Sequence, residues 1–171
     1  MLIKIGPIKE ASDVVDLLLE CHERIRFFVG LAGRLASCGP VSDNEVREAS
    51  AQLVRYFSES LLLHVADEEE SVLPRLLGRS GSLDEALAAM RGEHEQHREA
   101  LESLLGLCRK LESSPQQLPE LREKLRETAA SLEREFVVHL AQEESTVFPA
   151  IRTLLGIADQ EAMLREFRAR R

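Results

Sequence analysis

The sequence predicts an all-α protein, an up-down-up-down antiparallel four-helix bundle with a short extra C-terminal helix. Three observations lead to this prediction. The 171 residues are 44% hydrophobic and 30% charged, with 4% aromatic residues and no Trp, a composition that favours helices. Apolar residues recur at helical spacing through four long stretches. The Gly, Pro and Ser breaks between these stretches are short, and short connections place consecutive helices antiparallel.

The first two helices form a predicted hairpin. The first is expected over about residues 10–37 and ends before Gly39-Pro40. The second begins at a capping box, Ser42-Asp43-Asn44-Glu45, because the hydroxyl and carboxylate can satisfy backbone N–H groups at a helix start. It reaches Pro74, which should kink or end it.

The third helix follows the loop Gly78–Gly81. Its predicted start is a second capping box, Ser82-Leu83-Asp84-Glu85, and it runs to about Ser113 before Ser114-Pro115 breaks it.

The fourth helix carries Pro119 near its start, where proline is well tolerated, and stops near Pro149. We expect one domain over 1–171, with a bundle core of about 10–155, an N-terminal arm of 1–9 and a tail helix of 156–171.

One phrase occurs twice in the chain. The sequence reads HVADEEESVLP from His64 and HLAQEESTVFP from His139, with six of eleven positions identical. In both copies a Glu follows the His by four residues, giving the pairs His64/Glu68 and His139/Glu143. Four residues exceed one helical turn slightly, so each pair lies on one face, roughly 6 Å apart along the axis. Each pair can therefore converge on one point.

A further His precedes each copy at a similar distance, so the chain reads as two related helical hairpins. Each of the four histidines, two in each hairpin, continues a stripe of apolar residues and is expected to face the core. Burying the two carboxylates beside them would cost several kcal/mol each without a compensating cation. The predicted metal ligands are His22, His64, Glu68, His94, His139 and Glu143.

This order of motifs, with a hydrophobic residue and Pro after each His-x-x-x-Glu, resembles the hemerythrin family over about residues 13–155, particularly its hemerythrin-like (HHE cation-binding) domains. The resemblance implies a non-haem di-iron centre with a bridging oxo or hydroxo group. It also implies binding of, or reaction with, dioxygen, nitric oxide or peroxide for storage, sensing or detoxification. The implied roles are Glu68 and Glu143 bridging two iron ions, His22 and His64 on one, and His94 and His139 on the other.

The chain departs from the dioxygen-carrying hemerythrins, whose third helix carries His-x-x-x-His. Here the residue four after His94 is Arg98, and His97 follows at three. His97 is either a fifth His ligand or a residue that lines the bundle. The second bridging residue is Glu143 at four residues after its His, rather than an Asp at five. Both departures favour the broader hemerythrin-like group over a simple oxygen carrier.

The identity of the metal remains open. Nitrogen-rich ligation with two carboxylates suits iron and also accepts zinc or manganese.

The function is more typical of a metal- or ligand-binding protein than of a dedicated enzyme. The alternatives are an iron- or redox-responsive regulatory interaction module and a metal-free helical interaction bundle.

The composition also bounds the partners and the compartment. A net charge of −8 without a Lys/Arg-rich stripe argues against nucleic acid or an anionic membrane. The apolar start, 1–8, is too short for a signal peptide or a membrane span, so a cytoplasmic protein is expected. Cys21, Cys38 and Cys108 are scattered and odd in number, which favours ordinary buried thiols over disulfides or a zinc site.

Several charged residues near the predicted ligands have an open role. Glu69, Glu70 and Glu144 are expected on a solvated helix face, because neighbours on a helix are rotated by about 100° from each other. Arg26 and Arg98 are either partners of the carboxylates or members of helix-edge salt bridges.

Overall fold

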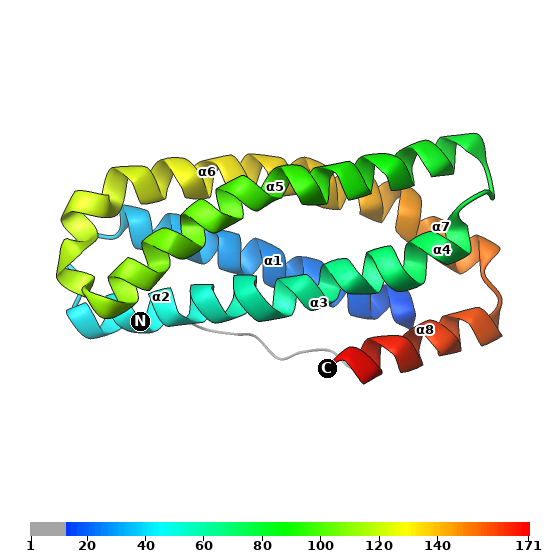
Figure 1. Ribbon diagram of the computed structural model, residues 1–171, viewed down its shortest axis with the longest axis horizontal. Helices are drawn as coiled ribbons and strands as arrows, with labels where there is room; N and C mark the ends of the chain where they lie inside the picture. Colours follow the sequence, from blue (N-terminus) through cyan, green and yellow to red (C-terminus); the bar gives the residue numbers. More distant parts are fainter. Residues whose placement is uncertain (1–12) are drawn as a thin grey trace. The chain divides into compact units, whose positions relative to one another are not determined.

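The computed structural model of the chain describes residues 13–171, and this part is helical without any strand (Figure 1). The predicted all-α class is therefore confirmed, whereas the arm predicted over 1–9 lies outside the described residues. The described chain divides into two compact units. The first unit contains Arg24–Leu61 and His97–Phe136; the second contains 13–23, Leu62–Gln96 and Val137–Arg171.

The first unit is built from long amphipathic helices. Ser42 Oγ accepts from the Glu45 N–H at 3.3 Å and the Glu45 carboxylate accepts from the Ser42 N–H at 3.2 Å, so the first capping box is confirmed. Phe28 and Tyr56 stack with ring centroids 3.9 Å apart. The helices that pass through this unit are α1 (Val14–Ser37), α2 (Asp43–Arg55), η1 (Tyr56–Ser60), α5 (Gly81–Ser113), η3 (Pro115–Gln117) and α6 (Leu118–Gln142).

The second unit contains the remaining helices and its own apolar core. Beside parts of α1, α5 and α6, its elements are α3 (Leu61–Ala66), η2 (Asp67–Val72), α4 (Leu73–Leu76), η4 (Glu143–Val147), α7 (Phe148–Leu154) and α8 (Ile157–Arg170). The core includes buried Leu18 of α1, Met90 of α5 and Phe148 of α7. It extends to Met163 and Phe167 of α8, so the predicted tail helix packs on this unit.

The two repeated phrases form π-helical turns. Leu73 N–H bonds to the carbonyl of Glu68 and Phe148 N–H to that of Glu143, five residues back in each case. A proline ring clashes with the carbonyl four residues earlier, and a wider π turn moves that carbonyl away. Pro74 was expected to kink or end the helix; the helix does not end there, and the kink stays a prediction.

The helices continue beyond both prolines. α4 extends to Leu76, and Gly78, with a φ of +81°, lies in the left-handed conformation that glycine adopts readily after a helix. Likewise α7 extends past Pro149 to Leu154.

The start of α5 differs from the prediction by two residues. Ser82 lies within the helix, and it is Ser80 whose Oγ accepts from the Leu83 N–H at 3.3 Å. Asp84 of the predicted box accepts instead from the Gly78 N–H at 2.7 Å. The Asp84 carboxylate therefore ties the start of α5 to the loop that precedes it.

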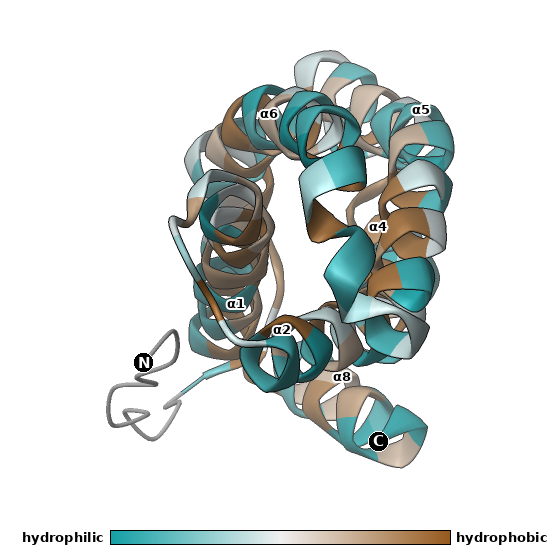
Figure 2. Cartoon of the chain, turned by 90° about the vertical axis from the view of Figure 1, so that its left-hand side faces the viewer, coloured by the Kyte–Doolittle hydropathy of each residue, from teal (hydrophilic) through white to brown (hydrophobic). Residues whose placement is uncertain are grey.

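Helix α8 is tied to η2 by charge as well as by apolar packing. Hydrophobic and hydrophilic residues alternate around α8 (Figure 2). Asp67 of η2 is fully buried and accepts from Arg170 at 2.9 Å and from Arg171 at 2.6 Å. Burial raises the pKa of Asp67, and the two guanidinium groups oppose that rise.

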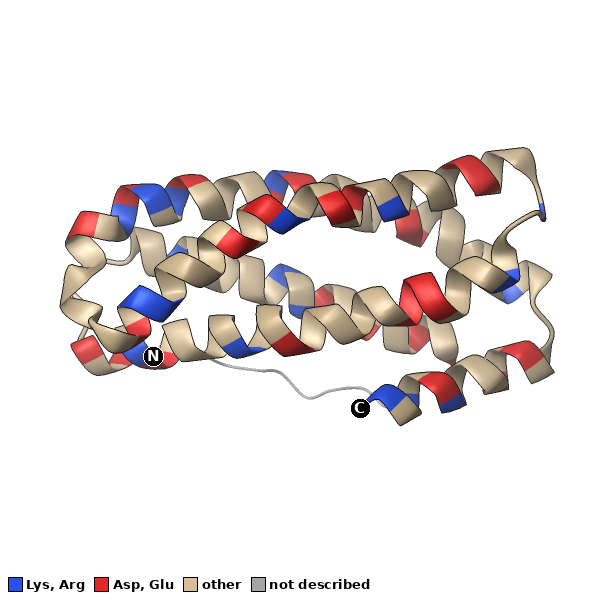
Figure 3. Cartoon of the chain, viewed as in Figure 1, with Lys and Arg blue, Asp and Glu red and all other residues tan. Residues whose placement is uncertain are grey.

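Charged residues are mixed along the helices. Acidic and basic residues are interspersed along the helices of the described part and form no basic stripe in this view (Figure 3). No helix among residues 13–171 combines the length and the apolar character that crossing a membrane requires.

We expect Phe167→Ala to lower the free energy of unfolding of the metal-free protein by about 3–5 kcal/mol, because the change leaves a cavity in the core of the second unit. The matched control on α8 is Ile157→Ala, whose side chain is 79% exposed and whose loss should cost less than about 0.5 kcal/mol. Urea unfolding followed by circular dichroism measures both. Equal effects would mean that α8 does not pack as described.

Candidate metal centre

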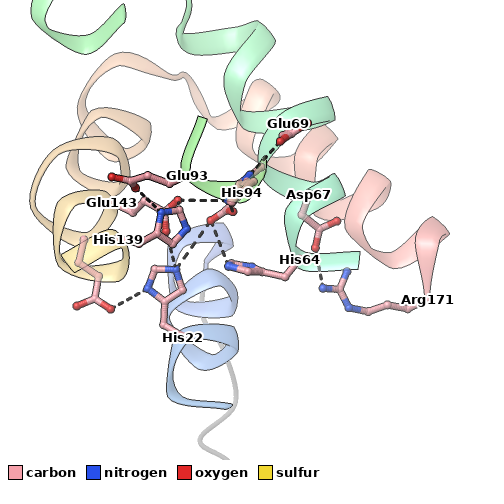
Figure 4. A network of polar contacts seen from close by, with 11 residues as sticks. His22, His64, Asp67, Glu69, Glu93, His94, His139, Glu143 and Arg171 are labelled. Carbon is pink, nitrogen blue, oxygen red and sulfur yellow. Dashed lines mark hydrogen bonds and ion pairs between the residues drawn. The ribbon is translucent and has the colours of Figure 1, made fainter. Parts of the chain in front are cut away.

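The six residues predicted as metal ligands all lie in the second unit and come together in its interior. The labelled imidazoles and Glu143 point toward one another (Figure 4). Five of the six residues are at most 2% exposed, and His94 is partly buried, with a side chain that is 8% exposed. They come from six elements: His22 from α1, His64 from α3, Glu68 from η2, His94 from α5, His139 from α6 and Glu143 from η4.

Their donor atoms form two overlapping groups. Glu68 and Glu143 belong to both groups, and within each group the donor atoms lie within 4.8 Å of one another. The first group adds His22 and His64, whose ring centroids are 5.2 Å apart; the second adds His94 and His139, at 4.9 Å.

Each shared carboxylate divides its two oxygens between the groups. Glu68 Oε1 lies 3.3 Å from His64 Nε2, and its Oε2 lies 3.3 Å from His94 Nε2. Glu143 Oε2 lies 3.2 Å from His22 Nε2, and its Oε1 lies 3.3 Å from His139 Nε2. A carboxylate with one oxygen toward each of two histidine pairs has the geometry that bridging two cations requires.

The inner polar atoms of this cluster lack hydrogen-bond partners. Within the described part of the chain, both oxygens of Glu68 and of Glu143 are buried without a hydrogen bond, as are the Nε2 atoms of His22, His64 and His94. The nearest nitrogens and oxygens are close without hydrogen-bond geometry. An unsatisfied buried polar group costs about 1–3 kcal/mol, and more when charged. Cations among these lone pairs would remove that cost, so the residues fit a metal site.

Carboxylates outside the cluster hold three of the imidazoles at the opposite ring nitrogen. A carboxylate that accepts from Nδ1–H fixes the tautomer, so that the Nε2 lone pair faces the cluster. The three pairs and their N···O distances are His22–Glu144 at 2.7 Å, His94–Glu69 at 2.9 Å and His139–Glu93 at 2.7 Å.

These contacts correct the expectation for two glutamates near the cluster and reveal a third glutamate that was not predicted. Glu69 and Glu144 do not simply occupy a solvated face, since each reaches an imidazole of another helix. Glu70 is 66% exposed, as expected, and meets Arg170. Sequence reasoning missed Glu93. The repeated Glu-Glu of both phrases was the signal for the first two residues, but no comparable repeat marks Glu93.

Other candidates lie outside both groups. His97 belongs to neither His/Glu group among the described residues, and its buried ring lies 4.7 Å from that of Phe136. Arg26 and Arg98 are exposed.

The three cysteines differ in burial. Cys108 is buried, and burial raises the pKa of its thiol to about 12. Cys21 and Cys38 are only half-buried, so the expectation of three buried thiols is wrong for them.

Burial and mutual contact shift the pKa values of the cluster in opposite directions. Burial lowers the pKa of His64 to about 4. Burial also acts to lower the pKa of His22 and of His94, but the carboxylates facing them outweigh it and raise both to about 9. Burial and the nearby Glu68 charge raise the pKa of Glu143 to about 8. Burial acts to raise the pKa of Glu68 too, yet the imidazoles hold it well below its usual range. Without metal, the cluster therefore holds protons at neutral pH.

These features define a helical protein with a buried cluster of histidines and carboxylates that can hold cations. A family profile described as the hemerythrin HHE cation binding domain matches residues 13–151. The chain belongs to this family, which confirms the resemblance seen in the sequence.

The curated relatives are all described as uncharacterized. They are "Uncharacterized protein Mb2018" of Mycobacterium bovis and "Uncharacterized protein MT2051" and "Uncharacterized protein Rv1995" of two Mycobacterium tuberculosis strains. Each is 29% identical over 118 residues, which is 69% of this chain and 44% of the relative. The chain thus spans less than half the length of these relatives. No solved structure matches it.

The metal-free protein is expected to lose thermal stability as pH rises from 6.5 to 9. Groups with raised pKa values stabilise the fold fully below their unfolded pKa and lose that contribution as pH rises through the folded pKa. His22 and His94 move from 6.5 to about 9, and Glu143 from 4.5 to about 8. Glu68 and His64, whose pKa values are lowered, act only on the acid side.

Thermal melts in the presence of a chelator across this pH range measure the effect. His22→Gln removes one of the titrating groups and should flatten the curve. A melting temperature that stays level or rises with pH in the parent protein would contradict the prediction.

Proposed function

We propose that the chain is a di-iron protein of the hemerythrin-like type, in which an antiparallel four-helix bundle holds two metal ions. The observation that carries this proposal is the division of the Glu68 and Glu143 oxygens between two histidine pairs. Membership of the cation-binding family supports it independently. The single-domain organisation expected from the sequence is part of the same proposal.

The proposed ligands fall into two positions. The first metal position is held by His22 and His64, and the second metal position by His94 and His139. Glu68 and Glu143, which belong to both donor groups, would be shared between the two positions. Imidazole nitrogen with carboxylate oxygen suits iron, and zinc or manganese remain compatible with the same donors, because affinity alone does not select among these metals.

The proposed ligand of the centre is a small molecule such as dioxygen, nitric oxide or peroxide. Each metal position has four protein donor groups, two of them shared, which leaves coordination sites for a small ligand. A bound iron pair would supply Lewis-acid and electron-transfer chemistry to such a molecule.

The protein residues control access and water. His94 is the most exposed of the four histidines, at 8% against 0–3% for the others, so the second metal position is the nearer to solvent. At the first position the Phe148 ring packs on His22 with centroids 4.8 Å apart and excludes water there.

A second candidate function is an iron- or redox-responsive interaction module. The observation that favours it is the adjacency of Asp67 and Glu68 in η2. Asp67 binds the arginines at the end of α8, and its neighbour is a proposed bridging ligand. Metal binding is coupled to folding in such sites, so occupancy would change how firmly α8 is held.

We expect the purified protein to contain two metal equivalents per chain by elemental analysis and, with iron, to show a near-ultraviolet charge-transfer band. The double variant His64→Ala, His139→Ala should lose both, because it removes one imidazole from each position. The matched control is His97→Gln, a histidine outside both groups, which should keep both metals.

Circular dichroism establishes that each variant is folded. A folded double variant that retains both metals would refute the ligand assignment. If the parent protein binds no metal when it is loaded anaerobically with Fe²⁺, the two-metal function is refuted and the metal-free interaction bundle is supported instead.

A further inference from the structure

The four imidazoles of the cluster differ in whether a carboxylate accepts a hydrogen bond from Nδ1. Three of them donate Nδ1–H to a carboxylate from another helix. The exception is His64, which is only 2% exposed and whose buried Nδ1 has no hydrogen-bond partner among residues 13–171. His64 is therefore the one member of the set without a group that fixes its tautomer and ring orientation.

Comparison of the two hairpins shows which supporting carboxylate the first hairpin lacks. In the second hairpin Glu93, directly before His94, holds the imidazole of His139. The corresponding residue of the first hairpin, directly before His22, is Cys21. A neutral thiol supplies neither the negative charge nor the strong acceptor that a carboxylate gives to an imidazole.

Charge around the two positions differs in the same sense. Two carboxylates, Glu69 and Glu93, support the imidazoles of the second metal position. At the first position, among the described residues, Glu144 alone does so. A cation at the first position therefore meets less negative charge from these supporting carboxylates.

We infer that the two metal positions are unequal: the second, at His94 and His139, binds a divalent cation tightly and fills first, whereas the first, at His22 and His64, binds it weakly and exchanges it. This inference rests on the proposed two-metal function. Loss of a carboxylate that orients a metal-bound imidazole typically lowers metal affinity about 10–100-fold, which sets the expected gap between the two positions.

Unequal positions have a chemical consequence. At limiting metal the protein exists as a one-metal form with the weak position available. A second cation of another kind can then enter beside the first, since similar donor sets accept several divalent metals. The composition of the pair would follow the metals present.

Anaerobic calorimetric titration of the metal-free protein with Fe²⁺ alone tests the inference. Two binding steps are expected, separated by about 10–100-fold in affinity. His139→Ala should abolish the tight step and leave a weak one. His64→Ala should keep the tight step and abolish the weak one. The opposite assignment would overturn the inference.

Two single variants test the carboxylate that holds the His139 imidazole and leave every proposed metal ligand unchanged. Glu93→Gln should weaken the tight step about 10–100-fold, because the amide that replaces the carboxylate carries no charge. Its control is Glu99→Gln, an exposed glutamate of the same helix, which should leave both steps unchanged. Identical titrations of both variants and the parent would overturn the inference.

A gain-of-function variant guards against loss of folding as the explanation. Cys21→Glu places in the first hairpin the residue type that the second already has, and should strengthen the weak step about tenfold or more. Cys21→Ser is the neutral control and should leave the gap unchanged. An unchanged gap in the folded Cys21→Glu variant would contradict the inference.

The possible failures are distinguishable. Two steps of equal affinity in the parent would overturn the unequal positions while leaving the two-metal function intact. Absence of any saturable Fe²⁺ binding would overturn both.

Discussion

The burial of two carboxylates between two pairs of imidazoles is the constraint on which this structure depends. Glu68 and Glu143 are almost fully removed from water, and no described residue donates a hydrogen bond to their oxygens. Apolar packing in the second unit has to compensate for this arrangement in the metal-free protein, because an ion pair taken out of water recovers its desolvation cost only with good geometry. The cluster is thus a local source of instability that a cation relieves.

The helices bring these groups together by a device that is used twice. Glu68 and Glu143 each lie in a π turn that ends just before a proline. Such turns interrupt the regular bonding ladder and are frequent at functional sites. Here they let the helix accommodate the proline and continue, so that α4 and α7 can contribute Leu76 and Ile151 to the core beyond each proline.

The sequence was sufficient to predict the helical class and the six residues that meet in the cluster. Both follow from patterns local in sequence: apolar spacing, turn residues and the repeated His-x-x-x-Glu. What it did not predict depends on other helices. Glu93 and Glu144 act on imidazoles that are 46 and 122 residues away, and no periodicity encodes such a partner.

Local competition explains the remaining differences. Ser80 takes the capping role predicted for Ser82, and Asp84 bonds the Gly78 N–H of the preceding loop. Pro74 does not end its helix, because the π turn before it moves away the carbonyl that the proline ring would meet. The bundle topology, the domain bounds and the metal assignments stay predictions.

The anchoring of α8 limits how the chain can be shortened or joined to another sequence. Arg170 and Arg171 bind the buried Asp67 carboxylate, at 2.9 and 2.6 Å. A truncation that removes them would strand a negative charge in the interior, one residue from Glu68. Any fusion after Arg171 therefore needs a flexible junction that leaves both guanidinium groups in place.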